Sequence, residues 1–156
     1  MTPITPDEII FKIGTFVHEI FIENVFVSTD AIEYAVNISR SDQLMNDHFP
    51  GTSIIQCFLQ GAMLLFYENQ TFFDPNKDLF FLGGVRIKYL KPILLGHYVK
   101  FRLSNIKYVH NILLFEAKSL DTAGKIYARC SGSLSSKSRK SMEEVLNKAT
   151  IVNNKQ

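Results

Sequence analysis

The feature that most constrains the fold is an apolar segment between Ser53 and Asn69, which shows scarcely any polar face before Glu68. A helix on the surface of a globular protein carries polar residues along one side. We therefore expect a helix that is surrounded by other structure, with Thr52 or Ser53 as its N-cap.

Segments rich in β-branched and aromatic residues flank this helix in the sequence, and each predicts a β-strand. A hairpin is expected before the helix and four strands after it, at residues 17–27, 31–38, 79–90, 97–108, 113–120 and 125–134. An antiparallel sheet that curves around one long central hydrophobic helix would bury that helix on all sides. The predicted fold class is therefore α+β.

Both ends of the chain are expected to carry short helices. A capping box at Thr5 and Glu8 predicts a helix that ends at Gly14. Residues 1–135 are predicted to form one domain, and residues 136–156 a polar linker with a short C-terminal helix or tail.

Composition narrows the class of protein further. A chain of 156 residues is about one domain, and a net charge of +2 does not favour nucleic acid as a partner. Two cysteines, Cys57 and Cys130, show neither a disulfide framework nor a zinc spacing. We therefore expect free thiols in a reducing cytoplasm, no metal, no cofactor, no signal peptide and no membrane segment.

One motif stands directly before the apolar helix, namely His48-Phe49-Pro50-Gly51. Together with the later strand that ends in Lys91-Pro92, this order resembles the bacterial 3-hydroxyacyl-acyl-carrier-protein dehydratases of the FabA/FabZ type. The resemblance covers roughly residues 10–135. It implies a hotdog fold whose subunits pair edge to edge as a homodimer or heterodimer, with the acyl tunnel at their interface.

Dehydration of a 3-hydroxyacyl thioester requires a base for the C2 proton, an acid for the leaving hydroxyl and donors to the thioester oxygen. By the resemblance, His48 is the catalytic base, while Phe49 and Gly51 shape the pocket. Backbone N–H groups at the helix start, with that of Cys57 as the candidate, polarise the carbonyl. The Cys57 thiol as a nucleophile is the alternative interpretation.

The second catalytic group of the family, a carboxylate on the helix, is missing. Ungapped alignment from His48 places that carboxylate at Ala62, and a slip of one residue places it at Gly61. Gln60 could orient a water molecule or hydroxyl, and Glu68 points to a different face of the helix. The residues expected to contact substrate are Phe49, Gly51, Gln60, Ala62 and, where glycine permits a close backbone approach, Gly84.

Three functions remain open at this stage. The first is a dehydratase of fatty-acid, polyene or polyketide biosynthesis whose site is completed by a carboxylate-bearing partner subunit. The second is a non-catalytic subunit that binds acyl chains, and the third is a thioesterase. Docking of the acyl carrier protein is expected at Arg86, Lys88 and Lys91, although ordinary solvated lysines explain this pattern equally well.

Overall fold

The computed structural model describes residues 1–69 and 73–155, and the predicted apolar helix lies at its centre. Helix α2 (Gly51–Asn69) has many buried aromatic and aliphatic side chains, including Phe58, Leu64 and Phe66. The helix begins earlier than predicted, because the Pro50 carbonyl already accepts the N–H of Ile54 at 3.0 Å. Thr52 and Ser53 therefore lie inside the first turn, and their prediction as N-caps is wrong.

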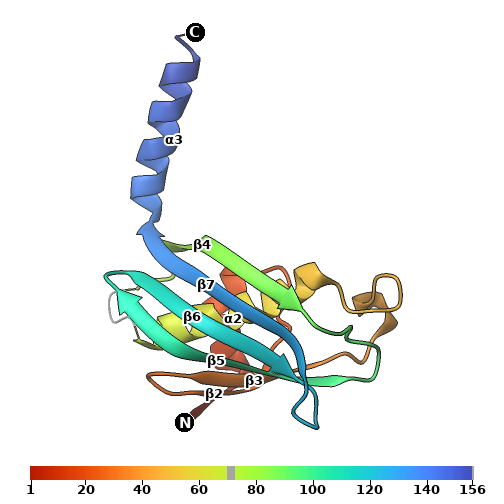
Figure 1. Ribbon diagram of the computed structural model, residues 1–156. Coiled ribbons are helices and arrows are strands. Elements are labelled where there is room, and N and C mark those ends of the chain that lie inside the picture. Colours follow the sequence, from red (N-terminus) through yellow and green to blue (C-terminus); the bar gives the residue numbers. More distant parts are fainter. Residues whose placement is uncertain (70–72, 156) are drawn as a thin grey trace.

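Within the described residues, seven strands form one antiparallel sheet in the order β1-β2-β3-β5-β6-β7-β4. Their bounds are β1 Thr2–Ile4, β2 Glu23–Val27, β3 Ile32–Asn37, β4 Asp78–Tyr89, β5 Tyr98–Val109, β6 Ile112–Leu120 and β7 Ile126–Ser138. Helix α2 runs behind this sheet in Figure 1 and contacts β3 to β7. The predicted α+β class, with an antiparallel sheet around one hydrophobic helix, is confirmed.

The first predicted strand is shorter than expected, because residues 17–22 are not part of the sheet. The amide of Gln60 on α2 binds this segment instead, accepting from the N–H of Phe21 at 3.0 Å and donating to the carbonyl of Glu19 at 2.7 Å. These two backbone groups are thus satisfied by a helix side chain instead of a neighbouring strand.

The N-terminal helix is confirmed where it was predicted. Helix α1 (Pro6–Ile13) has Thr5 as its N-cap and Gly14 as its C-cap. The Thr5 N–H donates to Glu8 Oε2 at 2.7 Å, which completes the predicted capping box. Two single turns of 3₁₀ helix, Gly14–Phe16 and Ser41–Gln43, connect the larger elements.

The C-terminal end differs from the predicted polar linker. Strand β7 pairs with β4 as far as the Asp78–Ser138 pair, and helix α3 (Arg139–Asn153) begins at the next residue. Ser138 caps this helix, since its Oγ accepts the Ser141 N–H at 3.1 Å. Helix α3 projects from the body beside β4, an edge strand of the sheet (Figure 1).

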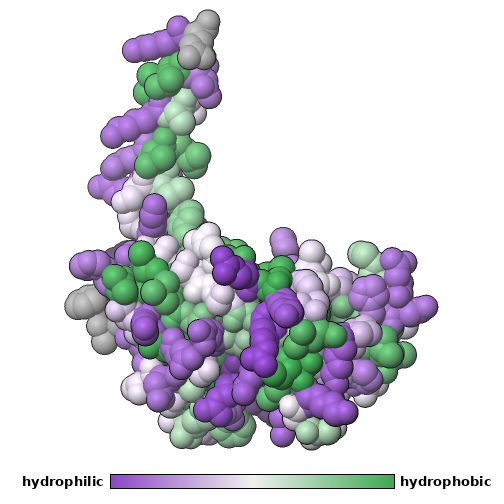
Figure 2. Space-filling view, in the orientation of Figure 1, coloured by the Kyte–Doolittle hydropathy of each residue, from purple (hydrophilic) through white to green (hydrophobic). Residues whose placement is uncertain are grey.

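Helix α3 buries none of its residues, and apolar side chains along it face solvent (Figure 2). They include Val145, Leu146, Ile151 and Val152. In residues 1–69 and 73–155, no helix combines the length and the apolar character that a membrane span requires.

Candidate functional site

A tight turn positions His48 at the start of α2. Asn46 and Asp47 both have positive φ, at 51° and 65°. Met45 and His48 close the turn, because the Met45 N–H donates to the His48 carbonyl at 2.8 Å. Two successive left-handed residues define a type I′ turn, for which Asn and Asp are well suited.

The same turn determines which ring nitrogen of His48 can act as a base. Nδ1 lies 3.0 Å from the carbonyl oxygen of Asn46. A carbonyl only accepts hydrogen bonds, so we assign the ring proton of neutral His48 to Nδ1. Nε2 then keeps a free lone pair, as a general base requires.

A cavity of about 450 Å³ lies beside the ring. Its lining residues are His48, Phe49, Gly51, Ile54, Tyr89, Leu90, Lys91 and Pro92. The structure therefore brings together three of the predicted site residues, His48, Phe49 and Gly51. Phe49 is buried and its ring packs edge-on against Phe21, with centroids 5.8 Å apart.

Tyr89 also lines this cavity, although no sequence pattern indicated that it would. Its hydroxyl donates to the Gly51 carbonyl at 2.9 Å, which ties the end of β4 to the first residue of α2. A side chain at position 51 would overlap this hydroxyl, since an added Cβ would lie 2.7 Å from it. Gly51 is thus required by the close approach of Tyr89.

The donors at the start of α2 are not the predicted ones. The first four N–H groups of a helix have no partner within the helix. Because α2 begins at Gly51, Cys57 lies in the second turn, where its N–H belongs to the helical ladder. The backbone donors of α2 closest to His48 along the chain are those of Gly51 and Thr52, and the expectation that Cys57 lies at the helix start is wrong.

The Cys57 thiol does not fit a nucleophile either. The side chain is fully buried, and this burial raises the pKa of the thiol far above its ordinary value. A reactive cysteine needs the opposite, namely a stabilised and accessible thiolate. Cys57 is therefore a small buried side chain of the helix.

Two further predicted contact residues lie elsewhere in the core. Gln60 is buried, both ends of its amide bind backbone, and it does not line the cavity of His48. Ala62 is fully buried and also absent from the cavity wall. The neighbouring Gly61 faces Tyr34, whose hydroxyl donates to the Cys57 carbonyl at 2.7 Å.

None of the described residues that line the cavity carries a carboxylate. Glu68, the helix carboxylate, forms an ion pair with Lys12 of α1. Glu19 lies 2.6 Å from Arg40. Both acids are thus engaged in ion pairs, and neither lines the cavity of His48.

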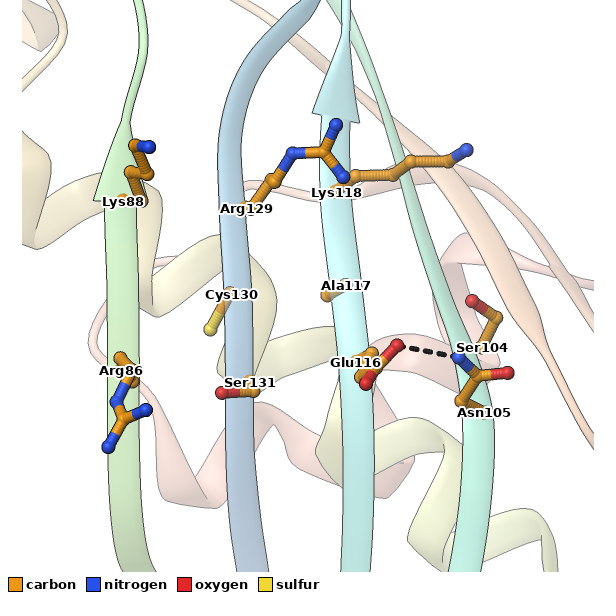
Figure 3. Close-up of a pocket in the computed structure, with 10 residues that line it drawn as sticks. All are labelled: Arg86, Lys88, Ser104, Asn105, Glu116, Ala117, Lys118, Arg129, Cys130 and Ser131. Carbon is orange, nitrogen blue, oxygen red and sulfur yellow. Dashed lines mark hydrogen bonds between the residues drawn. The ribbon is translucent and has the colours of Figure 1, made fainter.

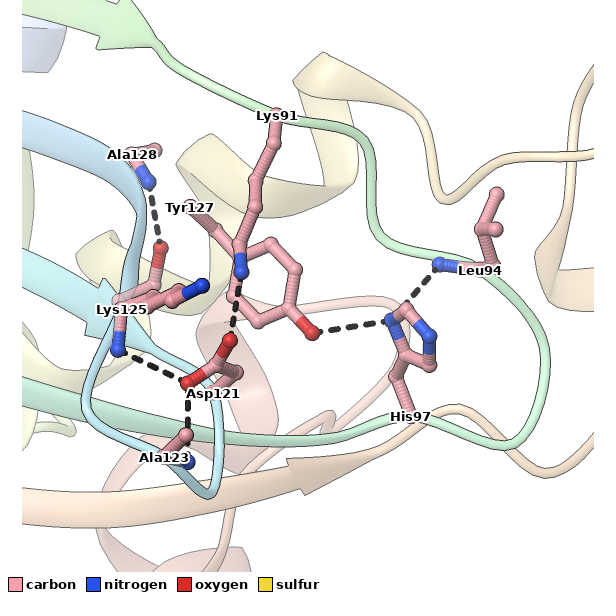
Figure 4. Close-up of polar contacts among 9 residues, drawn as sticks. Lys91, Leu94, His97, Asp121, Ala123, Lys125, Tyr127 and Ala128 are labelled. Atoms are coloured by element: carbon pink, nitrogen blue, oxygen red, sulfur yellow. Dashed lines mark hydrogen bonds and ion pairs between the residues drawn. The ribbon is translucent and has the colours of Figure 1, made fainter.

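Lys91, a predicted docking residue, contacts other residues of the same chain (Figure 4). Its Nζ lies 2.5 Å from Asp121 Oδ2 and 4.4 Å from the ring centroid of Tyr127. The hydrogen bond from Lys91, followed by that from the Lys125 N–H, lowers the pKa of Asp121. Lys91 therefore fixes the hairpin at 121–125 beside the cavity instead of presenting a free charge.

His97 belongs to the same group of contacts. Its Nδ1 lies 3.0 Å from the Tyr127 hydroxyl and 3.2 Å from the Leu94 N–H (Figure 4). An N–H donor at Leu94 requires Nδ1 to be an acceptor. We assign His97 as a structural residue that holds the loop between β4 and β5 against Tyr127.

The other predicted residues of β4 lie away from His48. The Gly84 N–H donates to Ser133 Oγ at 3.0 Å, at a β-bulge between Leu82 and Val85. Arg86 and Lys88 are exposed and line a different cavity, of about 480 Å³ (Figure 3). Gly84 is therefore not brought to the cavity that holds His48.

The fold is similar to those of several solved structures. A chain of the ApeI:P dehydratase heterocomplex of Xenorhabdus doucetiae matches with a TM-score of 0.70 at 17% identity, over 83% of this chain and 93% of that one. A thioesterase of Haemophilus influenzae matches with a TM-score of 0.62 at 14% identity, over 85% of each chain. A protein of Streptococcus mutans solved with acetyl-CoA matches with a TM-score of 0.60 at 14% identity, over 79% of this chain and 97% of that one.

Sequence comparison adds no relative, because no protein-family model matches the chain and no curated protein matches it. At such low identities the structural matches establish the architecture alone. The chain has the hotdog fold, as predicted, with α2 as its central helix.

Proposed function

We propose that the chain is a subunit of a 3-hydroxyacyl-acyl-carrier-protein dehydratase of fatty-acid, polyene or polyketide biosynthesis. His48 supplies the base, and a partner subunit of the same fold supplies the acid. The observation that carries this proposal is the hydrogen bond from His48 Nδ1 to the Asn46 carbonyl, at 3.0 Å. It leaves Nε2 free to act as a base on a residue that lines the cavity of about 450 Å³.

Each group has one role in the proposed reaction. Nε2 of His48 takes the C2 proton of the 3-hydroxyacyl thioester while N–H groups at the start of α2 stabilise the negative charge on the thioester oxygen. The C3–oxygen bond then breaks as an acid protonates the hydroxyl, and water and the 2-enoyl thioester are the products. The apolar side chains of Phe49, Ile54 and Leu90 suit the first carbons of the acyl chain.

The acid has to come from outside this chain. The cavity wall carries no carboxylate among its described residues, and Ala62 and Gly61 occupy the two candidate positions on α2. A general acid contributes on the order of 10²–10⁴-fold to such a step, so the chain alone would be slow. The likeness to a chain of a dehydratase heterocomplex supports a partner that fills this role.

The free edge of β4 is the proposed site of pairing. Strand β4 is the last in the sheet order, so one of its edges has no neighbouring strand within the described chain. Its C-terminal end carries Tyr89, which lines the cavity and remains 46% exposed, and the next residue, Leu90, is 47% exposed. A second hotdog subunit added to this edge would cover both residues and close the cavity.

Coexpression with candidate hotdog partners tests the proposal. We expect dehydration of a 3-hydroxyacyl-carrier-protein substrate by the complex, and a loss of about 10²-fold or more in kcat for His48→Ala. His18→Ala, which removes an exposed imidazole outside the cavity, is the matched control and should keep wild-type kcat. Equal rates for the two variants would show that this chain is a non-catalytic subunit.

A thioesterase remains the second candidate, because a thioesterase and an acetyl-CoA-bound protein share the fold. Release of a free thiol from an acyl-coenzyme A, monitored with a thiol reagent, separates the two reactions. The dehydratase proposal expects no thiol release above background. Thiol release that depends on His48 would instead identify the chain as a thioesterase.

A further inference from the structure

Four basic residues stand opposite one another across four neighbouring strands on the outer face of the sheet. Lys88 of β4 pairs with Arg129 of β7, which pairs with Lys118 of β6, which pairs with Arg102 of β5. Figure 3 shows the first three on adjacent strands beside the cavity of about 480 Å³. Lys118 and Arg129 were not among the predicted docking residues, because their alignment with Lys88 depends on strand register.

In the part of the chain that the structure describes, an ion pair neutralises one end of this row. Arg102 lies 2.6 Å from Glu33. In the described parts of the chain, the salt bridges include none that involves Lys88, Arg129 or Lys118.

The nearest acid on the neighbouring row does not pair with these cations either. Glu116 stands opposite Ser131, and its Oε2 accepts a hydrogen bond from Asn105 at 2.6 Å (Figure 3). Like charges directly opposite each other destabilise a sheet, so a row without counter-charges costs stability in the isolated chain. An anionic partner on this face would remove that cost.

The geometry of the row favours an acidic helix. Neighbouring strands lie about 4.8 Å apart, and residues i and i+4 of an α-helix are separated by about 6 Å along its axis. Carboxylates on successive turns of a helix laid across the strands can therefore each meet one cation of the row. A single phosphate group would meet only one or two of them.

The row also lies close to the proposed active site. Lys88 on the outer face immediately precedes Tyr89, which lines the cavity of His48. A protein docked on the row would therefore lie beside the end of β4 that contributes to the cavity wall.

We propose that Lys88, Arg129 and Lys118 form a docking row for an acidic helix of the acyl carrier protein. The identity of that partner rests on the proposed function, whereas the anionic character of the ligand rests on the row itself. The proposal leaves Lys91 out of the docking surface, since Lys91 is already paired with Asp121.

Binding of labelled apo acyl carrier protein, measured by fluorescence anisotropy, tests the row without occupying the cavity. The variant Lys118→Glu/Arg129→Glu is compared with Lys140→Glu/Lys148→Glu, which makes the same change of charge on exposed α3. We expect the row variant to weaken binding about tenfold or more, the α3 variant to change it less than about twofold, and salt to weaken wild-type binding.

The milder Lys118→Gln/Arg129→Gln variant should change affinity in the same direction, and it relieves repulsion within the sheet, so its fold is expected to persist. Equal affinities for the row and α3 variants, or no binding of apo carrier protein by the wild type, would overturn the proposal. Binding of coenzyme A that requires the row, without binding of carrier protein, would identify a phosphate site instead. Dehydration plays no part in this assay, so an inactive complex that still binds through the row contradicts only the proposed function.

Discussion

At the level of single residues, a backbone carbonyl sets the chemistry of the site. The Asn46 carbonyl fixes the tautomer of His48, and Asn46 can present it because an asparagine tolerates the left-handed backbone of the turn. In the proposed dehydratase, the turn would thus prepare His48 as the base before any substrate or partner is bound.

Gly61 is expected to tolerate no side chain. An added Cβ would lie 2.3 Å from Cε1 of Tyr34, whose ring is held by its hydrogen bond to Cys57 and by stacking on Phe101. Gly61→Ala should therefore reduce the free energy of unfolding by about 1–3 kcal/mol, measured by chemical denaturation. Gly84→Ala, where an added Cβ meets nothing within 4 Å, is the control, and equal losses at both positions would refute this explanation.

Cys130 should make stability fall at alkaline pH. Burial raises the pKa of its thiol from 9.0 to about 11. In the unfolded chain the thiol ionises near its ordinary pKa, so the folded state holds the proton more tightly between these values. The free energy of unfolding should decrease as the pH rises through this range.

The comparison with Cys130→Ala isolates this contribution from those of other buried groups. Denaturation curves between pH 8 and 11 should fall less steeply for the variant than for the wild type. Identical pH dependence in the two proteins would show that Cys130 does not contribute.

At the level of elements, α3 differs from the rest of the chain because it buries nothing. A helix of its length is marginal in water when isolated, and its exposed apolar side chains add little stability to the body. In a domain of this size, a loss of about 1 kcal/mol in the free energy of unfolding lowers Tm by about 2–4 °C. Because α3 contributes less than this, deletion of residues 139–156 should shift Tm by less than about 2 °C. A loss of more than about 5 °C in a thermal scan would show that α3 packs on the body.

The sequence predicted best the elements that local pattern decides. Helix α2 has a uniform apolar character that only burial explains, and the hairpins after it follow their turn residues. Residues 17–22 have equally strong strand propensity, yet Gln60, distant in the chain, takes their hydrogen bonds. Strand β7 continues to Ser138 because β4 offers a pairing partner that a run of serines does not reveal.

Local sequence pattern likewise predicted one part of the candidate site and missed another. His48, Phe49 and Gly51 are adjacent in sequence, and the structure keeps them together around one cavity. Tyr89 joins them through a contact across the chain, which no local pattern indicates. The expectation that Cys57 lies at the helix start was wrong because it depended on the exact first residue of the helix.

At the level of the whole molecule, the proposed function makes this chain one half of a catalytic site. His48 and the first residue of α2 line one cavity, whose described lining residues include no carboxylate, and the edge strand β4 lies beside that cavity. Such a subunit is active only if a second subunit contributes the missing carboxylate to the same cavity.

A double-mutant cycle in the reconstituted complex tests this claim most directly. The rate of 2-enoyl thioester formation is measured for His48→Ala in this chain, for the catalytic carboxylate of the partner changed to alanine, and for both together. If the two residues act as a unit on one substrate, the double variant should be about as slow as the slower single variant. Losses that multiply, or a partner that keeps full activity with His48→Ala, would contradict a shared site.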